Sequence, residues 1–133
     1  MKVYIAARFH EKEKVKKIYT LLEQKGCTIT QDWTTCTTQK PYHQHRKDAQ
    51  ECARHAIQGV KECDIFIYLT NPEIGAGSST EFGAALMSRI SFGFPTIYIV
   101  GPERDTNICF YHPTVQLKHT IEEVLEEISQ KIA

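Results

Sequence analysis

Short apolar runs alternate along the chain with longer stretches in which apolar residues recur at helical spacing. Runs of this length, rich in β-branched and aromatic residues, are typical of buried strands. They predict four strands and a short fifth strand at the sheet edge, over residues 3–7, 27–33, 64–69, 95–100 and 115–117. The run at 64–69 predicts a strand most clearly.

Helical spacing fills the segments between these runs. Helices are predicted over 11–25, over 44–62, over 78–90 and from 120 onward. In the first of them, Val15 and Ile18 share an apolar face. Ser78 or Ser79 is expected to cap the third helix, and Thr120 the fourth, because short hydroxyl side chains accept hydrogen bonds from free N–H groups.

Strands and helices therefore alternate throughout the 133 residues. This order predicts an α/β fold with right-handed crossovers, a mostly parallel sheet and helices on both faces. The length suits one compact domain, spanning residues 1–133. Such sheets bind ligands in a crevice at the carboxyl ends of their strands. Those ends are expected at 7–9, 32–33, 70–77 and 101–107.

The charge balance excludes some classes of partner. Lys plus Arg and Asp plus Glu number 16 each, so no net field favours a nucleic acid polymer or an anionic membrane. No apolar stretch approaches the roughly 20 residues that span a bilayer. The start of the chain reads as a strand and not as a secretory signal. We expect a small-molecule partner and a cytoplasmic location.

The five cysteines and six histidines show no pattern of a disulfide framework or a metal site. No CxxC pair occurs, so the cysteines are expected to be reduced thiols, mostly small core residues. His43 and His45 are spaced so that they could chelate together, with His55 nearby, but no third ligand is fixed. Walker and GxGxxG motifs do not occur either. Neither a metal nor another cofactor is predicted.

The segment 75–86, GAGSSTEFGAAL, carries the most chemical information. Gly75 and Gly77 allow the backbone to approach a ligand closely, and a helix N-terminus presents free N–H groups to an anion. Glu81 is expected about one turn into this helix, at the lip of the crevice. The spacing alone leaves two interpretations open, because Glu81 could complete a helix cap with Ser78 or could be a reactive carboxylate.

Three motifs occur in an informative order, namely YIAARF at 4–9, CDIFI at 63–67 and GSSTEFGAAL at 77–86. Together they resemble the nucleoside 2-deoxyribosyltransferase-like family, which includes deoxynucleoside 5′-monophosphate N-glycosidases. The resemblance implies a flavodoxin-like, doubly wound sheet of four to five strands, and a homodimer or higher homo-oligomer. It also implies that Glu81 is a nucleophile that attacks the anomeric carbon, with Tyr4 holding its carboxylate. A carboxylate is chemically suited to form such a covalent glycosyl intermediate.

One position departs from the family pattern. The family usually carries an Asp eight residues before the position of Asp64, where this chain has Ala56. Loss of a general acid typically costs about 10²–10⁴-fold in rate. Three explanations stay open: the acid role has moved, for example to His55, the reaction differs, or the site is degenerate.

Three residues at the predicted crevice are candidates for substrate binding. Arg8 could bind a phosphate or carboxylate, although a solvated surface role fits equally well. Phe9 could line a base pocket or pack in the core. Trp33, the single Trp of the chain, could stack on a base or act as a structural lid.

Three further binding residues are assigned mainly by the resemblance. Related glycosidases bind phosphate in the loop that corresponds to Gly77 and Ser79, and the Ser79 hydroxyl could donate together with helix N–H groups. Asn107 lies in a late loop that, in the family, can reach the site of a neighbouring subunit.

The sequence therefore predicts cleavage or transfer of the N-glycosidic bond of a nucleoside or nucleoside 5′-monophosphate. The alternative is a non-catalytic nucleotide-binding or signalling module on the same fold, and Ala56 is the feature that motivates it. Hydrolysis is favoured over transfer, and Arg8 with Ser79 favours monophosphates. The base and the sugar stay open.

Overall fold

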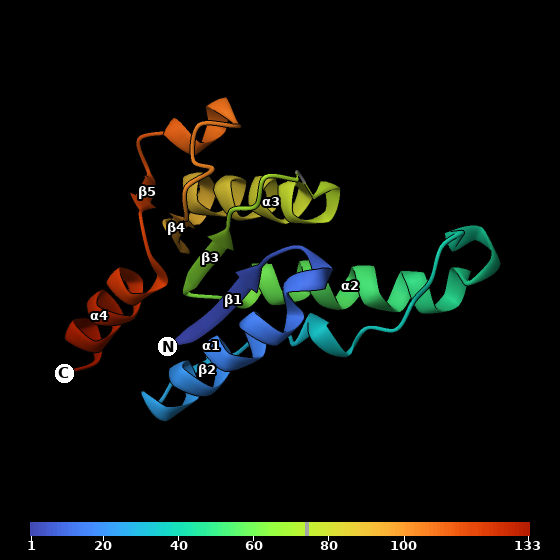
Figure 1. Ribbon diagram of the computed structural model, residues 1–133, viewed down its shortest axis with the longest axis horizontal. Coiled ribbons are helices and arrows are strands. Elements are labelled where there is room, and N and C mark those ends of the chain that lie inside the picture. Colours follow the sequence, from blue (N-terminus) through green and yellow to red (C-terminus); the bar gives the residue numbers. More distant parts are fainter. Residues whose placement is uncertain (74) are drawn as a thin grey trace.

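The computed structural model describes residues 1–73 and 75–133, and it contains one sheet of five parallel strands. The strands are β1 (Lys2–Ala6), β2 (Thr28–Ile29), β3 (Ile65–Leu69), β4 (Thr96–Val100) and β5 (Val115–Lys118). Their spatial order is β2-β1-β3-β4-β5 (Figure 1). This is the flavodoxin-like, doubly wound order, whose switch point lies between β1 and β3. The predicted fold class is confirmed.

Two pairs of helices cover the two faces of the sheet. The helices are α1 (Lys12–Gln24), α2 (Arg46–Glu62), α3 (Ala76–Phe92) and α4 (Ile121–Ile132). Apolar residues of α1 and α4 share one core cluster with the sheet, and apolar residues of α2 and α3 share the other. The alternation of side chains along each strand explains the two clusters, because successive residues point to opposite faces.

Strand β1 shows how this alternation positions the site. Val3 and Ile5 face α1 and α4, whereas Tyr4 and Ala6 face α2 and α3. In the parallel register, Tyr4 lies beside Phe66 of β3. A tyrosine at the switch point is thereby aimed at the layer that carries Glu81.

Two predicted boundaries are wrong in ways that matter for the site. The second strand ends at Ile29, and Trp33 instead begins a 3-10 helix, η2 (Trp33–Thr35), which the Asp32 side chain caps. Helix α3 begins at Ala76 after Gly75, with no side-chain cap, so the predicted cap by Ser78 or Ser79 is also wrong. The Ser78 side chain is buried within the first turn of the helix. The Thr120 cap of α4 is confirmed.

The prediction that all cysteines are reduced thiols is wrong for two of them. Cys36 and Cys52 form a disulfide, whereas Cys27, Cys63 and Cys109 are free. The segment after η2 folds back along α2, which brings the Cα atoms of Cys36 and Cys52 within 6.3 Å. That distance permits a disulfide, and it depends on a tertiary contact that the spacing of cysteines does not encode.

Three further 3-10 helices lie in the connections. They are η1 (Phe9–Glu11) after β1, η3 (Tyr42–Gln44) before α2, and η4 (Ile108–Tyr111) before β5. The first of them directly follows β1 at the carboxyl edge of the sheet, and the second lies at the start of α2. In the part of the chain that the structure describes, every helix is too short or too polar to cross a bilayer.

Candidate functional site

A tyrosine and a glutamate form the centre of the candidate site. Tyr4 is fully buried and stacks against Phe66, with ring centroids 5.9 Å apart. Its hydroxyl donates a hydrogen bond to Oε2 of Glu81, which comes from the second turn of α3. The predicted contact between these two residues is therefore present, although it joins positions 77 residues apart in sequence.

A glycine of α2 makes room for this pair. A Cβ atom at Gly59 would lie 2.7 Å from Cβ of Gln31 and 3.0 Å from Cδ2 of Tyr4. Real side chains do not tolerate such distances, so α2 can pack against the Tyr4 ring only with glycine at this position. Gly59 is a supporting residue that the sequence analysis did not identify.

Burial makes the Glu81 carboxyl an unusually weak acid. Withdrawal from water raises its pKa from 4.5 to about 7, even though the hydrogen bond from Tyr4 acts in the opposite direction. Burial and the nearby Glu81 charge raise the pKa of Tyr4 well above its usual value, so the phenol remains a donor. A buried carboxyl that titrates near neutrality is a frequent mark of a functional site.

Glu81 opens onto a cleft of about 600 Å³, the Glu81 cleft. Four segments line it: the end of β1, η2, residues 40–42 and the first turns of α3. The predicted binding residues Arg8, Phe9, Trp33 and Gly77 all lie in this lining together with Glu81. A volume of this size accommodates a small metabolite.

Aromatic rings form one wall of the Glu81 cleft. The Phe9 and Trp33 rings lie 6.2 Å apart and are tilted by 46°. The Trp33 indole N–H donates to the Ile5 carbonyl oxygen, which fixes the ring over the end of β1. Trp33 thus has a structural role and also presents a face to the cleft.

Two residues of the opposite wall were missed by the sequence analysis. Lys40 and Tyr42 line the Glu81 cleft, and the Lys40 ammonium lies 5.8 Å from the centre of the Tyr42 ring. A basic and an aromatic residue beside Pro41 were visible in the sequence. Nothing local indicated, however, that this segment would line the same cleft as Arg8 and Phe9.

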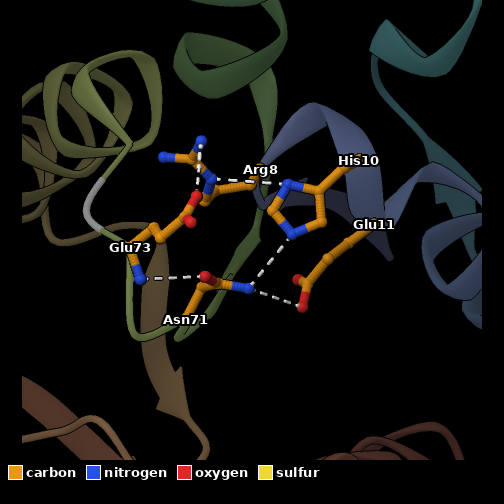
Figure 2. Close-up of polar contacts among 5 residues, drawn as sticks. All are labelled: Arg8, His10, Glu11, Asn71 and Glu73. Atoms are coloured by element: carbon orange, nitrogen blue, oxygen red, sulfur yellow. Dashed lines mark hydrogen bonds and ion pairs between the residues drawn. The ribbon is translucent and has the colours of Figure 1, made fainter.

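Arg8 is held by a polar network that joins two loops of the site (Figure 2). Its guanidinium pairs with Glu73 at 3.1 Å and its Nε contacts His10 at 3.5 Å. Asn71 donates to Glu11 at 3.0 Å and accepts from the Glu73 backbone N–H at 2.9 Å. The Glu73 side chain is 73% exposed, and ion pairs at such positions contribute only about 0–1 kcal/mol. The Arg8–Glu73 ion pair therefore adds little to the stability of the fold.

Ser79 and Asn107 lie apart from the other candidates. They line a separate cavity of about 40 Å³ with Tyr68 and Phe110. The Ser79 hydroxyl is hydrogen-bonded to Tyr68, and the Asn107 side chain caps η4 by accepting from the Cys109 N–H. Their roles in binding stay predictions, and the structure does not bring them together with Glu81.

The position of Ala56 is not compensated by His55. His55 lines a different cavity, with Asp48 and Glu51, and its Nε2 lies 3.6 Å from the Glu51 carboxylate. Among the described residues that line the Glu81 cleft, Glu81 is the single carboxylate. Within residues 1–73 and 75–133, no group of three His, Cys, Asp or Glu side chains could hold a metal ion.

Fold and site together define a flavodoxin-like α/β domain with a buried carboxylate–phenol pair at the carboxyl edge of its sheet. The sequence matches no known family model and no curated protein.

Two solved structures share this fold over nearly the whole chain. The first is a CMP N-glycosidase, BcmB, of Clostridium botulinum, which is 20% identical, with a TM-score of 0.67 over 98% of this chain and 99% of that one. The second is a 2-deoxyribosyltransferase of the psychrotolerant bacterium Bacillus psychrosaccharolyticus, which is 14% identical, with a TM-score of 0.65 over 94% and 90%. The fold implied by the resemblance of the sequence motifs is confirmed.

Proposed function

We propose that the chain cleaves the N-glycosidic bond of a nucleoside or nucleoside 5′-monophosphate, with Glu81 as the nucleophile. The observation that carries the proposal is the buried Tyr4–Glu81 pair opening onto a cleft large enough for such a substrate. The names of the two similar structures, a CMP N-glycosidase and a 2-deoxyribosyltransferase, point to the same bond. A buried carboxylate such as Glu81 is suited to attack the anomeric carbon of such a bond.

In the proposed first step, a Glu81 carboxylate oxygen bonds to the anomeric carbon. The C–N bond breaks, and its electron pair leaves with the base, so that a glycosyl ester remains on the enzyme. The Tyr4 hydroxyl holds Oε2, which orients the carboxylate. A Cβ atom at Gly77 would lie 3.9 Å from Oε1, so the lack of a side chain there keeps the approach to this oxygen open.

In the proposed second step, a water molecule or a second base attacks the glycosyl ester and releases Glu81. We favour water and hence hydrolysis. The base gains negative charge as the C–N bond breaks and ends with the proton that the attacking water gives up, so it needs a donor beside it. The family Asp that could serve is replaced by Ala56. Lys40 and Tyr42 carry donor groups in the lining of the cleft, and we assign the support of the leaving base to them.

The test is release of free base from a panel of nucleosides and nucleoside 5′-monophosphates, with ribose and with 2-deoxyribose. Wild-type protein is expected to release base from at least one member, and Glu81→Gln is expected to release none. Retained turnover in Glu81→Gln would remove Glu81 from the nucleophile role.

A non-catalytic nucleotide-binding module is the second candidate. It is favoured by Ala56 and by the lack of another carboxylate among the described residues of the cleft. It predicts tight binding of a nucleotide with no base released during long incubation at high enzyme concentration. Any release that depends on Glu81 decides against it.

We further propose a homodimer. Gly83, Met87 and Ile90 share one face of α3, at i, i+4 and i+7, and the latter two side chains are 62% and 55% exposed. An apolar helix face of this kind is typical of an interface. Ile90→Glu is expected to convert the dimer to a monomer in sedimentation, and an unchanged sedimentation coefficient would contradict this face.

We keep the cytoplasm as the proposed location. In a reducing compartment the Cys36–Cys52 bond is expected to exist partly as two thiols. Alkylation of the protein in intact cells, followed by mass measurement, tests both statements.

A further inference from the structure

The connection between η2 and α2, residues 36–45, carries part of the wall of the Glu81 cleft. Figure 1 shows this connection as a loop that extends away from the sheet, and every residue from 39 to 48 is exposed. Lys40 and Tyr42, which line the cleft, both lie in it. Among the described residues, its backbone hydrogen bonds run within the connection or to the adjoining turns of η2 and α2. The rest of the protein therefore supplies little that would hold this wall in place.

The Cys36–Cys52 disulfide is the covalent anchor of the connection. It joins the start of the connection to the second turn of α2, across 16 positions of sequence. The Thr38 hydroxyl adds one contact, at 3.1 Å from the Cys52 Sγ. A disulfide restricts the conformations of the loop that it closes, and reduction returns that freedom. The position of Lys40 and Tyr42 thus depends on the redox state of one cysteine pair.

A small molecule can reach the disulfide from the surface. Neither Cys36 nor Cys52 is buried, and both residues line an open cavity of about 230 Å³. Its other described walls carry polar side chains, among them Gln31, Asp48 and His55, so the cavity suits a water-soluble thiol. Exposed disulfides are reduced more readily than buried ones, and those of cytosolic proteins are usually transient or redox-sensing.

The Thr38 hydroxyl sets the direction in which the disulfide opens. A disulfide sulfur carries no hydrogen, so the hydroxyl is the donor in its contact with the Cys52 Sγ. A donor at this position stabilises negative charge on Cys52. Cys52 is therefore the better leaving group, and Cys36 is the sulfur that an incoming thiolate attacks.

We propose that the Cys36–Cys52 pair is a thiol–disulfide switch that controls the Glu81 cleft. A thiolate of a small thiol or dithiol attacks the Cys36 Sγ, the S–S bond breaks, and its electron pair stays on the Cys52 Sγ, which takes a proton from water. A second thiolate attacks the mixed disulfide, so that Cys36 leaves as a thiolate and is protonated in turn. The protein gains two electrons and two protons, and two thiols of the reductant are oxidised to one disulfide.

The two forms of the protein differ in the wall of the Glu81 cleft. The oxidised form holds Lys40 and Tyr42 at the cleft, and the reduced form releases them. Because the proposed function assigns these two residues to the leaving base, reduction lowers the rate of base release. This inference rests on the proposed function and adds the regulation of the same site.

The test compares the oxidised protein with protein that has been reduced by dithiothreitol and then freed of it. Alkylation and mass measurement check the two forms, which should carry three and five reactive thiols. In the reduced form, kcat/KM for base release is expected to be about 10–100-fold lower, because the cleft wall is displaced. Cleavage by chymotrypsin after Tyr42, which needs no substrate of the protein, is expected to be at least about 10-fold faster.

Variants connect the response to this cysteine pair. Cys36→Ser leaves the described lining of the Glu81 cleft intact, and its kcat/KM and cleavage rate are expected to match those of reduced wild type with or without dithiothreitol. Cys109→Ser is the matched control, because Cys109 is an exposed free cysteine of η4, and it is expected to keep the full response. If Cys36→Ser does not fold, the two forms of the wild-type protein carry the test.

A further variant tests the direction of attack. Thr38→Val removes the donor beside Cys52, so reduction of the pair by dithiothreitol is expected to be about 3–10-fold slower. An unchanged rate of reduction overturns the assigned direction.

The outcomes separate this inference from the proposed function. Equal or higher kcat/KM in the reduced form, with Glu81-dependent base release, overturns the switch and leaves the glycosidase proposal standing. Equal cleavage rates overturn it too, because the wall then stays in place without the disulfide. A dithiothreitol response that persists in Cys36→Ser also overturns it. No base release from either form removes the glycosidase proposal and the switch together. Slower base release and faster cleavage on reduction, with neither response in Cys36→Ser, support the switch.

Discussion

Two tyrosine–glutamate pairs lie on opposite faces of the same sheet. On the α2 and α3 face, Tyr4 donates to Glu81, and on the α1 and α4 face, Tyr98 donates to Glu127 at 2.7 Å. The pairs have the same chemistry, yet the pKa of Glu81 is raised to about 7 while that of Glu127 is lowered. The difference shows what makes a carboxylate a candidate for catalysis.

A neighbouring cation explains the contrast. The Lys118 ammonium pairs with Glu127, and the Glu127 side chain is 34% exposed. Its negative charge is therefore stabilised by a cation and by water. Among the described residues, Glu81 has the Tyr4 phenol as its single hydrogen-bond partner, and its burial outweighs that hydrogen bond. A buried carboxylate that lies beside a cleft without a neighbouring cation is more reactive than a carboxylate in a solvated ion pair. We therefore place the first pair in the candidate site and the second in the scaffold.

The largest effect is expected from removing the two carboxylates in turn. Glu81→Gln should lower kcat/KM for base release by at least about 10³-fold, because the nucleophile is lost. Glu127→Gln should leave kcat/KM within about twofold of wild type. The comparison breaks if both variants, measured on the same substrate, lose similar activity.

Removing the phenol of Tyr4 or of Tyr98 should have a smaller effect on kcat/KM and should also separate the two pairs. Wild-type kcat/KM should rise with pH and level off above about 7, because Glu81 attacks in its ionised form. Tyr4→Phe removes the hydrogen bond that lowers the Glu81 pKa, so kcat/KM should fall by about 10–100-fold and the rise should move to higher pH. Tyr98→Phe should leave the pH profile unchanged. An unshifted profile in Tyr4→Phe would contradict the assigned role of Tyr4.

Two glycines test how closely the scaffold supports the reactive pair. Gly59→Ala places a Cβ against Gln31 and Tyr4, so it should lower the free energy of unfolding by about 1–3 kcal/mol and also reduce kcat/KM. Gly83 lies on the proposed dimer face, so Gly83→Ala is measured in the monomeric Ile90→Glu background. There its Cβ meets nothing within 4 Å and should raise the free energy of unfolding by up to about 1 kcal/mol. Urea unfolding of both variants measures the difference. Equal effects would show that α2 does not constrain Tyr4.

The smallest effect concerns stability as a function of pH, and the two carboxylates should act with opposite sign. Between pH 4.5 and about 7, the folded protein keeps a proton on Glu81 that the unfolded chain has lost, so this group lowers stability as pH rises. Glu81→Gln should therefore raise the free energy of unfolding at pH 8 by roughly 1–3 kcal/mol, and by much less at pH 4.

The pKa of Glu127 is lowered in the fold, so its contribution is present above the ordinary glutamate pKa and is lost as pH falls. Glu127→Gln should lower the free energy of unfolding at pH 8 by less than about 1 kcal/mol, since the pair is partly exposed. Unfolding curves of both variants at pH 4 and pH 8 provide the measurement. If both substitutions changed the free energy of unfolding at pH 8 in the same direction, the comparison would be contradicted.

The sequence by itself determined the framework of the site. Alternating strand and helix patterns predicted the parallel sheet, and the carboxyl end of its first strand places Arg8 and Phe9 at the cleft. The motif around Glu81 and the resemblance of Tyr4 to a family tyrosine predicted the central contact. The sheet and its helices depend on period and order, which are properties of local sequence. The Tyr4–Glu81 contact was expected only from the resemblance to a family.

Only the tertiary structure decided the rest. The fold-back of the segment around Lys40 and Tyr42 and the Cys36–Cys52 bond both arise from contacts between distant parts of the chain. The acidity of Glu81 does so too, because desolvation depends on every atom that excludes water from a carboxyl group. A residue type and its spacing do not contain that information.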